Sequence, residues 1–342
     1  MSKGLEVPAG RTVDPVMAQQ RAASFTKRSI KTTTKAVGLR LALSMVDLTT
    51  LEGKDSPEKV RSLCRKAVRP FERDDDVLGE RLPSCAAVCV YPSMVAVARE
   101  ELEQADGRDA HSTRNAVKVA SVATGFPSGQ YPLSVRLRDT EQAIADGADE
   151  IDMVINRGAF LAGRYAEVAE EIREVVAVCD AGTGGAFPRP VHLKVILETG
   201  ELETLDNVRR ASDIAIACIR DGDFIKTSTG KVQPAATMPV TLVMLEAIRD
   251  ECLRSGRRIG MKPAGGIRTA KQALHYLVMV WETMGTVGIE TSRHQGAETG
   301  KSAWLSPDLF RFGASTLVND LLRQIVKERT GRYAAGYDFS EA

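Results

Sequence analysis

A lysine at the end of a short apolar run is the first feature of this sequence that could do chemistry. Phe224 and Ile225 predict a short buried strand that ends at Lys226. A lysine is costly to bury unless it has a partner or a purpose. Small hydroxyl residues, Gly230 and Lys231 follow, a composition typical of a loop that binds an oxyanion. The stretch therefore predicts an amine nucleophile beside a phosphate site.

Two more lysines occupy comparable positions in other predicted strands. Lys194 lies in the strand predicted over residues 191–197, and Lys262 lies in the strand predicted over 259–263. One buried lysine alone more often pairs with a carboxylate, whereas three that share one edge of a sheet favour catalysis. The polar residues expected at strand ends are Asp47, Cys89, Asp152, Lys194, Lys226 and Lys262.

The chemistry of such a cluster follows from lysine protonation. A free lysine has a pKa of about 10.4 and is almost fully protonated near pH 7. Burial and a neighbouring ammonium group favour the neutral amine, which is a nucleophile. We therefore expect Lys262 to favour the neutral form of Lys226, which could then attack a carbonyl and form a Schiff base. The protonated imine accepts electrons from a breaking carbon–carbon bond, and Asp152 is expected to transfer protons.

The elements that position these residues follow a regular alternation of apolar strands and amphipathic helices. The expected strands cover residues 41–47, 84–91, 117–124, 150–155, 191–197, 224–226, 259–263 and 310–314. Eight strands, each followed by a helix, over about 270 residues predict an α/β fold of the TIM (β/α)8 barrel type. A doubly wound open sheet is the alternative, but it usually has a glycine-rich turn after its first strand. This chain has Asp47-Leu-Thr-Thr50 at that point.

The domain organisation is expected to be one catalytic barrel with additions. The barrel is assigned to residues 41–330, an N-terminal helical extension to 1–40, and a C-terminal tail to 331–342. A polar segment over 284–308 delays the eighth strand and is interpreted as a surface insertion. It contains Gly296-Ala-Glu-Thr-Gly-Lys-Ser302, which is one residue short of a phosphate-binding G-x4-GK[ST] motif and follows no strand.

Three loops supply the expected phosphate site. TIM barrels commonly bind phosphate with the loops after strands seven and eight, together with a helix N-terminus. The residues of the loops after strands six, seven and eight that fit this role are Gly230, Lys231, Gly265, Gly266, Gly313 and Ser315. Beside a lysine cluster, they predict a small phosphorylated aldehyde or ketone as the substrate.

The composition argues against several kinds of binding partner. A net charge of +1 gives no reason to expect nucleic acid or an acidic membrane surface, and no run approaches about 20 apolar residues. The six cysteines lack zinc-site spacing, so we expect reduced thiols in a cytoplasmic protein. No cofactor is expected. The first 28 residues lack the apolar region of a secretory signal. Their basic bias could indicate a transit peptide or a nucleic-acid arm, but a solvated extension leading to a helix over one barrel end is favoured.

Five motifs, in order along the chain, resemble those of the deoxyribose-phosphate aldolases. They are Glu150-Ile-Asp-Met-Val154, Leu193-Lys-Val-Ile-Leu-Glu-Thr-Gly-Glu-Leu202, Phe224-Ile-Lys-Thr-Ser-Thr-Gly-Lys231, Lys262-Pro-Ala-Gly-Gly266 and Phe312-Gly-Ala-Ser315. The resemblance runs from about Ala42 to Thr316. The long N-terminal extension and the sequence Thr330-Gly-Arg-Tyr-Ala-Ala335 resemble the longer, animal-type branch of that family.

The resemblance implies a class I aldolase that needs no metal. Such an enzyme cleaves 2-deoxy-D-ribose 5-phosphate reversibly to D-glyceraldehyde 3-phosphate and acetaldehyde, in deoxyribonucleotide catabolism. By position, Lys226 would be the Schiff-base lysine, Lys262 would promote its neutral form, and Asp152 would belong to the proton relay. The implied substrate-binding residues are Asp47, Thr49, Cys89, Lys194, Thr229, Gly230, Lys231, Gly265, Gly266, Gly313 and Ser315. A homodimer is expected by analogy with family members.

Two points stay open at this level. Short bacterial members end in a tyrosine that assists proton transfer, whereas this chain continues for five residues beyond Tyr337, and Tyr333 competes for the role. A related Schiff-base aldolase acting on another phosphosugar is a second interpretation. A phosphosugar-binding regulator is a third, although binding alone requires no second buried lysine.

Overall fold

Eight parallel strands form the centre of the molecule. The computed structural model describes residues 8–108, 117–182, 190–285, 287 and 302–340. The strands are β1 (Val46–Thr49), β2 (Ala87–Val90), β3 (Lys118–Val122), β4 (Glu150–Val154), β5 (His192–Ile196), β6 (Phe224–Lys226), β7 (Gly260–Lys262) and β8 (Phe312–Gly313). Their order in the sheet is β7-β6-β5-β4-β3-β2-β1-β8. Single bridges from Met261 to Phe310 and from Ala264 to Gly313 link the two outer strands, so the sheet closes as a barrel.

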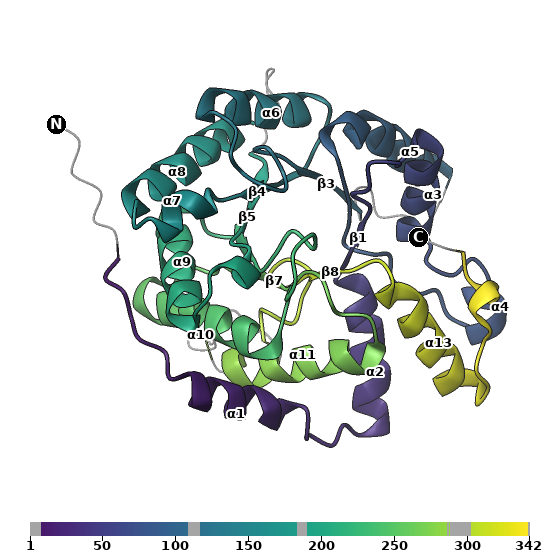
Figure 1. Cartoon of the computed structure of the whole chain (residues 1–342). Helices are drawn as coiled ribbons and strands as arrows, with labels where there is room; N and C mark the ends of the chain where they lie inside the picture. The colour runs from purple at the N-terminus through teal and green to yellow at the C-terminus, as the bar shows by residue number, and fades with distance from the viewer. Residues whose placement is uncertain (1–7, 109–116, 183–189, 286, 288–301, 341–342) are drawn as a thin grey trace.

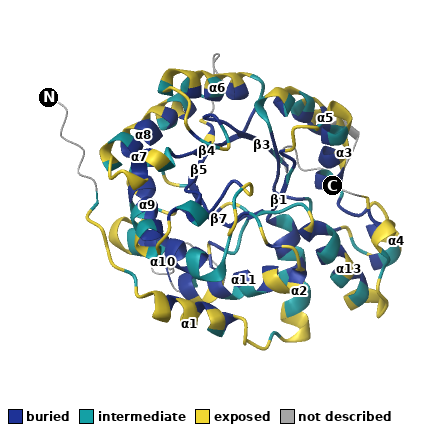
Figure 2. Cartoon of the chain, in the orientation of Figure 1, coloured by how far each residue is buried: buried dark blue, intermediate teal, exposed yellow. Residues whose placement is uncertain are grey.

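Helices surround this barrel (Figure 1). Those between the strands are α3 (Pro57–Val68), α4 (Asp74–Leu78), α5 (Val95–Arg108), α6 (Leu133–Ala145), α7 (Arg157–Leu161), α8 (Tyr165–Ala181), α9 (Leu205–Cys218), α10 (Met238–Ser255) and α11 (Ala270–Met284). Helix α13 (Leu317–Thr330) follows β8, while α1 (Pro15–Phe25) and α2 (Thr32–Ser44) precede β1. The strands are buried and the outer helix faces are exposed (Figure 2). The predicted TIM barrel is confirmed.

Local sequence explains where the main helices begin and end. The Ser56 side chain caps the first turn of α3, directly before Pro57. Thr269 and Gln272 form a reciprocal capping box at the start of α11. Helix α10 ends at Gly256, whose φ of 78° is a left-handed conformation that glycine adopts without strain. The helices therefore return the chain to the barrel at defined points.

The two N-terminal helices pack on the outer layer. Helix α1 contacts α10 and α11, and α2 contacts α11 and α13. The strand predicted over residues 41–47 is wrong in its first part, because α2 continues to Ser44 and β1 begins at Val46. Leu39, Ala42 and Leu43 are fully buried at helical spacing, so tertiary packing keeps this apolar run helical. The proposed domain boundary after residue 40 thus falls inside a helix.

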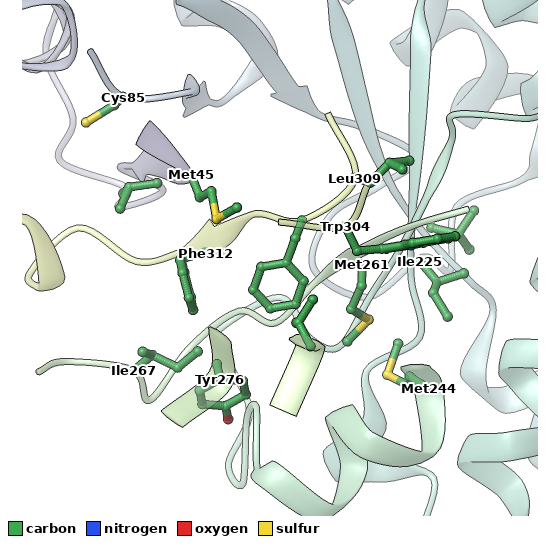
Figure 3. Close-up of a cluster of buried hydrophobic side chains, with 14 of the residues drawn as sticks. Met45, Cys85, Ile225, Met244, Met261, Ile267, Tyr276, Trp304, Leu309 and Phe312 are labelled. Carbon is green, nitrogen blue, oxygen red and sulfur yellow. The ribbon is translucent and has the colours of Figure 1, made fainter. Parts of the chain in front are cut away.

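The segment before β8 contains a core residue. The prediction of a surface insertion over 284–308 is wrong for Trp304, which is fully buried. Figure 3 shows Trp304 within the buried cluster that includes Met261 and Leu309. Its indole N–H donates a hydrogen bond of 2.8 Å to the backbone carbonyl of Ile259, directly before β7. Almost all of the Walker-like stretch at 296–302 lies outside the described residues.

We expect Trp304→Phe to lower the free energy of unfolding by about 1–3 kcal/mol, because it leaves a buried carbonyl without its donor. The matched control is Trp281→Phe, since Trp281 on α11 is 46% exposed and should change stability by less than about 0.5 kcal/mol. Urea unfolding followed by far-UV circular dichroism measures both values. Equal effects for the two variants would contradict the structural role assigned to Trp304.

Candidate active site

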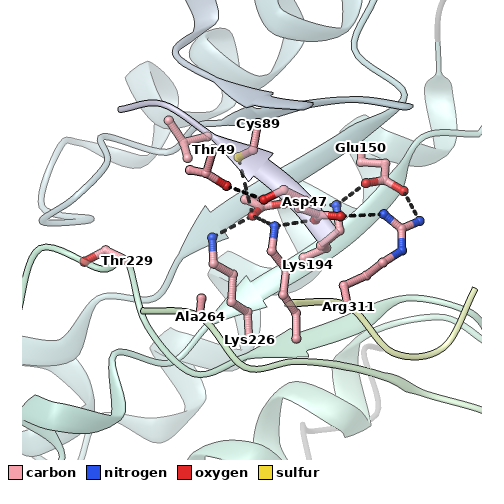
Figure 4. A network of polar contacts seen from close by, with 12 residues as sticks. Asp47, Thr49, Cys89, Glu150, Lys194, Lys226, Thr229, Ala264 and Arg311 are labelled. Carbon is pink, nitrogen blue, oxygen red and sulfur yellow. Dashed lines mark hydrogen bonds and ion pairs between the residues drawn. The ribbon is translucent and has the colours of Figure 1, made fainter. Parts of the chain in front are cut away.

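Three lysines and one aspartate meet inside the barrel (Figure 4). Lys194, Lys226 and Lys262 come from β5, β6 and β7, and Asp152 comes from β4. The strand register pairs Asp152 with Lys194 and Lys226 with Lys262. Between β5 and β6 the register pairs Lys194 with Phe224, so Lys226 lies two residues further along its strand than Lys194. All four side chains point to the inside of the barrel, as the alternation along each strand predicts.

Asp152 is the common partner of the three lysine side chains. Its Oδ2 accepts hydrogen bonds from Lys226 Nζ at 2.7 Å and from Lys262 Nζ at 2.9 Å. Its Oδ1 accepts a hydrogen bond from Lys194 Nζ at 3.1 Å. Asp152, Lys194 and Lys262 are fully buried, and Lys226 is 2% exposed. One carboxylate thus holds three lysine side chains in fixed positions.

A second layer of charges lies behind this group. Asp47 pairs with Lys262 at 2.6 Å and with Arg311 Nη1 at 2.8 Å. Arg311 Nη2 also pairs with Glu150 Oε1 at 3.1 Å, and Glu150 Oε2 accepts a short hydrogen bond from Lys194. The sequence interpretation missed Arg311 and Glu150. The sequence did contain a signal for each of them. Arg311 lies within the apolar run before β8, and Glu150 lies two residues before Asp152, on the same face of the strand.

Burial and ion pairing act in opposite directions on the carboxyl groups. Burial alone would raise the pKa of Asp152, but its interactions with Lys194, Lys226 and Lys262 hold that pKa well below its usual range. Burial likewise opposes ionisation of Asp47 and Glu150, yet the cations around them keep both pKa values lowered. All three acids are therefore carboxylates at neutral pH.

The same balance keeps two of the lysines protonated. Burial lowers the pKa of Lys262, but the carboxylates of Asp152 and Asp47 outweigh it and raise the pKa above the ordinary value. For Lys194, Asp152 and Glu150 outweigh burial in the same way. Both side chains are therefore ammonium groups over the physiological pH range.

A cleft of about 450 Å³ opens above the charge network. Lys226 lines the cleft, whereas Lys262, Lys194, Asp47 and Cys89 are fully buried and do not line it. The other predicted site residues that line it are Thr49, Thr229, Gly230, Lys231, Gly265, Gly266, Gly313 and Ser315. The predicted residues thus form two layers, with Lys226 as the member of the buried group that reaches open space.

Glycine conformation shapes the rim of the cleft. Gly230, Gly265 and Gly266 have φ values of 83°, 78° and 83°, which side-chain-bearing residues rarely adopt. A Cβ atom on Gly265 would lie 2.7 Å from the Cβ of Ala235, so the loops also need the missing side chain for close approach. No side chain caps the N-terminus of α13, which begins just after Ser315. Its first N–H groups suit an anion.

Charged side chains at the rim add two residues that the sequence interpretation missed. Glu52, in the loop after β1, forms an ion pair of 2.8 Å with Lys231. Arg268 also lines the cleft, in the loop after β7. Tyr333 and Tyr337 are 56% and 91% exposed and do not line the cleft. The Tyr333 hydroxyl instead accepts a hydrogen bond from Lys327 on α13.

No metal site is evident in the described part of the chain, where no group of three His, Cys, Asp or Glu side chains is arranged to hold an ion. The oxygen atoms of Asp47, Glu150 and Asp152 are instead directed to lysine and arginine nitrogens. What the geometry provides is an amine at the base of a cleft rimmed by glycine loops.

Comparison with known proteins identifies the family of this chain. The model of the DeoC/LacD family aldolases matches residues 41–306. The chain belongs to the DeoC/LacD family of aldolases. It is 43% identical to the human deoxyribose-phosphate aldolase over 316 residues, which cover 91% of this chain and 88% of that protein. It is 39% identical to the deoxyribose-phosphate aldolase of Agrobacterium fabrum, over 87% of this chain and 95% of that protein.

Solved structures share the barrel of this aldolase. A protein from Toxoplasma gondii ME49 superimposes with a TM-score of 0.64 at 24% identity, over 88% of this chain and 98% of that one. The tetrameric deoxyribose phosphate aldolase from Aeropyrum pernix gives a TM-score of 0.52 at 23% identity, over 74% of this chain and 91% of that one. The comparisons therefore support an aldolase, a carbon–carbon lyase, on a TIM barrel.

We expect Cys89 of the folded aldolase to resist alkylation at pH 8. Burial, reinforced by the carboxylate of Asp152, raises its pKa to about 11, so only about one thiol in a thousand is ionised at that pH. Iodoacetamide labelling followed by peptide mass spectrometry should be at least about 100-fold slower in the native protein than in urea. Comparable labelling rates in the two states would show that the thiol is accessible and ionised.

Proposed function

We propose that this aldolase cleaves 2-deoxy-D-ribose 5-phosphate reversibly to D-glyceraldehyde 3-phosphate and acetaldehyde through a Schiff base on Lys226. The observation that carries the proposal is the position of Lys226, which joins the buried charge network to a cleft rimmed by glycine loops. The names of the human and Agrobacterium relatives support the choice of substrate. The proposed pathway role is the catabolism of deoxyribonucleotides.

The proposed reaction begins at the aldehyde carbon of the sugar phosphate. The neutral amine of Lys226 attacks C1, and loss of water gives a protonated imine. Removal of the C3 hydroxyl proton breaks the C2–C3 bond, and the electron pair moves into the imine to form an enamine. Glyceraldehyde 3-phosphate then leaves. Protonation of the enamine carbon and hydrolysis of the imine release acetaldehyde and regenerate the amine.

Asp152 and Lys262 are proposed to carry protons during these steps. Asp152 Oδ2 contacts both Lys226 and Lys262, so a proton can pass from one amine to the other along two hydrogen bonds. Because the pKa of Asp152 is held low, this carboxylate is a weak base that relays a proton rather than retaining it. The paired Lys262 supplies a positive charge beside the developing imine.

The phosphate end is proposed to bind at the rim. Lys231, the N–H groups that begin α13 and the Ser315 hydroxyl border the same cleft as Lys226. A phosphate bound there would compete with Glu52 for Lys231, because the two anions repel each other at that position. The remote phosphate would thus orient the aldehyde at Lys226.

A borohydride trapping experiment tests the proposed intermediate. With deoxyribose 5-phosphate or acetaldehyde, reduction should fix a covalent adduct on Lys226, which peptide mass spectrometry would locate. Lys226→Arg should abolish the adduct and lower kcat by at least about 1,000-fold, because a guanidinium stays protonated and cannot form the imine. Trapping on another residue would overturn the mechanism. Trapping only with a different sugar phosphate would favour the second interpretation, a related aldolase.

The phosphate site has its own test in Lys231→Met. We expect KM for deoxyribose 5-phosphate to rise by about 10-fold or more, because a charge-assisted contact is lost. The cleavage of unphosphorylated 2-deoxyribose should change by less than about twofold. Lys54→Met, on the exposed part of the loop after β1, is the matched control and should behave as wild type. An equal loss with both substrates would place the effect of Lys231 elsewhere.

Assembly and location are also proposals. We retain a homodimer as the expected assembly, although the Aeropyrum pernix relative is described as tetrameric. A cytoplasmic location is supported by six free cysteines. None of the helices in the described part of the chain has the length and apolar character needed to cross a bilayer.

A further inference from the structure

The charges inside the barrel do not balance if every group is ionised. Seven ionisable side chains form one buried, hydrogen-bonded network. The acids are Asp47, Glu150 and Asp152, and the bases are Lys194, Lys226, Lys262 and Arg311. Three carboxylates therefore face four bases. The network becomes neutral when one base gives up its proton.

The contacts of the four bases identify the one that can do so. Arg311 is permanently charged and pairs with two carboxylates. Lys194 and Lys262 also pair with two carboxylates each. Lys226 pairs with a single carboxylate among the described residues, Asp152, which it shares with the other two lysines. Losing the proton of Lys226 therefore sacrifices the least ion pairing.

We propose that Arg311 and Glu150 are positioning residues that set the protonation of Lys226 through this charge balance. The proposal rests on the proposed function, in which Lys226 must be neutral to attack the substrate. Neither residue lines the cleft, so neither touches the substrate. Arg311 adds the positive charge that leaves Lys226 without a carboxylate of its own, and Glu150 offsets part of that charge.

The surroundings of Lys226 support the assignment. The titratable and charged groups around it are Asp47 on β1, Cys89 on β2, Glu150 and Asp152 on β4, Lys194 on β5, Lys262 on β7 and Arg311 before β8, with Glu198 and Lys231 toward the rim. Cys89 is uncharged at neutral pH because burial raises its pKa. An uncompensated buried charge is costly, so the network favours the release of one proton, and Lys226 has the fewest ion pairs of the four bases.

Two substitutions should move the enzyme in opposite directions. Arg311→Met removes a positive charge, so Lys226 should hold its proton to a higher pH. Glu150→Gln removes a negative charge while preserving shape, so Lys226 should lose its proton at a lower pH. The readout is the pH at which the rate of borohydride trapping is half-maximal. We expect each midpoint to shift by about one pH unit, since charges interact over several ångströms through an effective dielectric constant of about 20.

Three further variants make the experiment specific. Arg311→Lys keeps the charge and should retain most of the wild-type pH profile. The double variant with Arg311→Met and Glu150→Gln restores the charge count, so its midpoint should return toward that of wild type. Arg209→Met removes a buried guanidinium from α9, where it pairs with Asp213 and Asp250, and should shift no midpoint.

The outcomes separate this inference from the proposed function. Failure of the wild-type protein to form an adduct at Lys226 would overturn the proposed function itself. Normal wild-type trapping with unshifted midpoints in both single variants, or with shifts in the same direction, would overturn the charge-balance role alone. If Arg311→Met does not fold, Glu150→Gln decides, because an acid shift of its midpoint supports the role and an unchanged or alkaline midpoint refutes it.

Discussion

The carboxylate of Asp152 is the contact on which the interior of this aldolase depends. Three lysine side chains converge on its two oxygen atoms, and none of the four side chains is more than slightly exposed. Without that carboxylate, the lysines of three adjacent strands would repel one another in a medium that screens charge poorly. The barrel therefore needs Asp152 for its own stability as well as for the chemistry that we propose.

Depth divides the site into two parts with different physical properties. The buried charges are held by direct ion pairs that solvent cannot screen, so their mutual positions are fixed before any substrate arrives. The rim consists of backbone turns, glycines and partly exposed side chains such as Lys231 and Glu52. A buried reaction centre beneath a more exposed rim fits an enzyme whose substrate carries its reactive carbonyl and its phosphate at opposite ends.

Sequence alone predicted the barrel and the central lysines because both depend on local patterns. Alternation along β4 to β7 put the polar residues on the inner face, and glycines marked the rim loops. The partnership of Glu150 with Arg311 was missed because the two residues are 161 positions apart and only barrel closure joins them. The start of β1 was misjudged because no glycine or proline separates the apolar end of α2 from the strand. Sequence alone also did not predict that Cys89 lies beneath the cleft, because the depth of a residue depends on how the whole barrel assembles.

The packing of α1 has a consequence for how this protein can be altered. Helix α1 lies outside the ring of barrel helices and contacts α10 and α11, the helices that follow β6 and β7 (Figure 1). Ala22 and Phe25 are 1% exposed in that interface. The N-terminal extension thus braces the helices behind the strands that carry Lys226 and Lys262. Removing α1 to leave a minimal barrel would expose the apolar surface of α10 and α11 that it covers. A solubility tag or fusion partner is therefore better joined ahead of Asp14, which caps the helix.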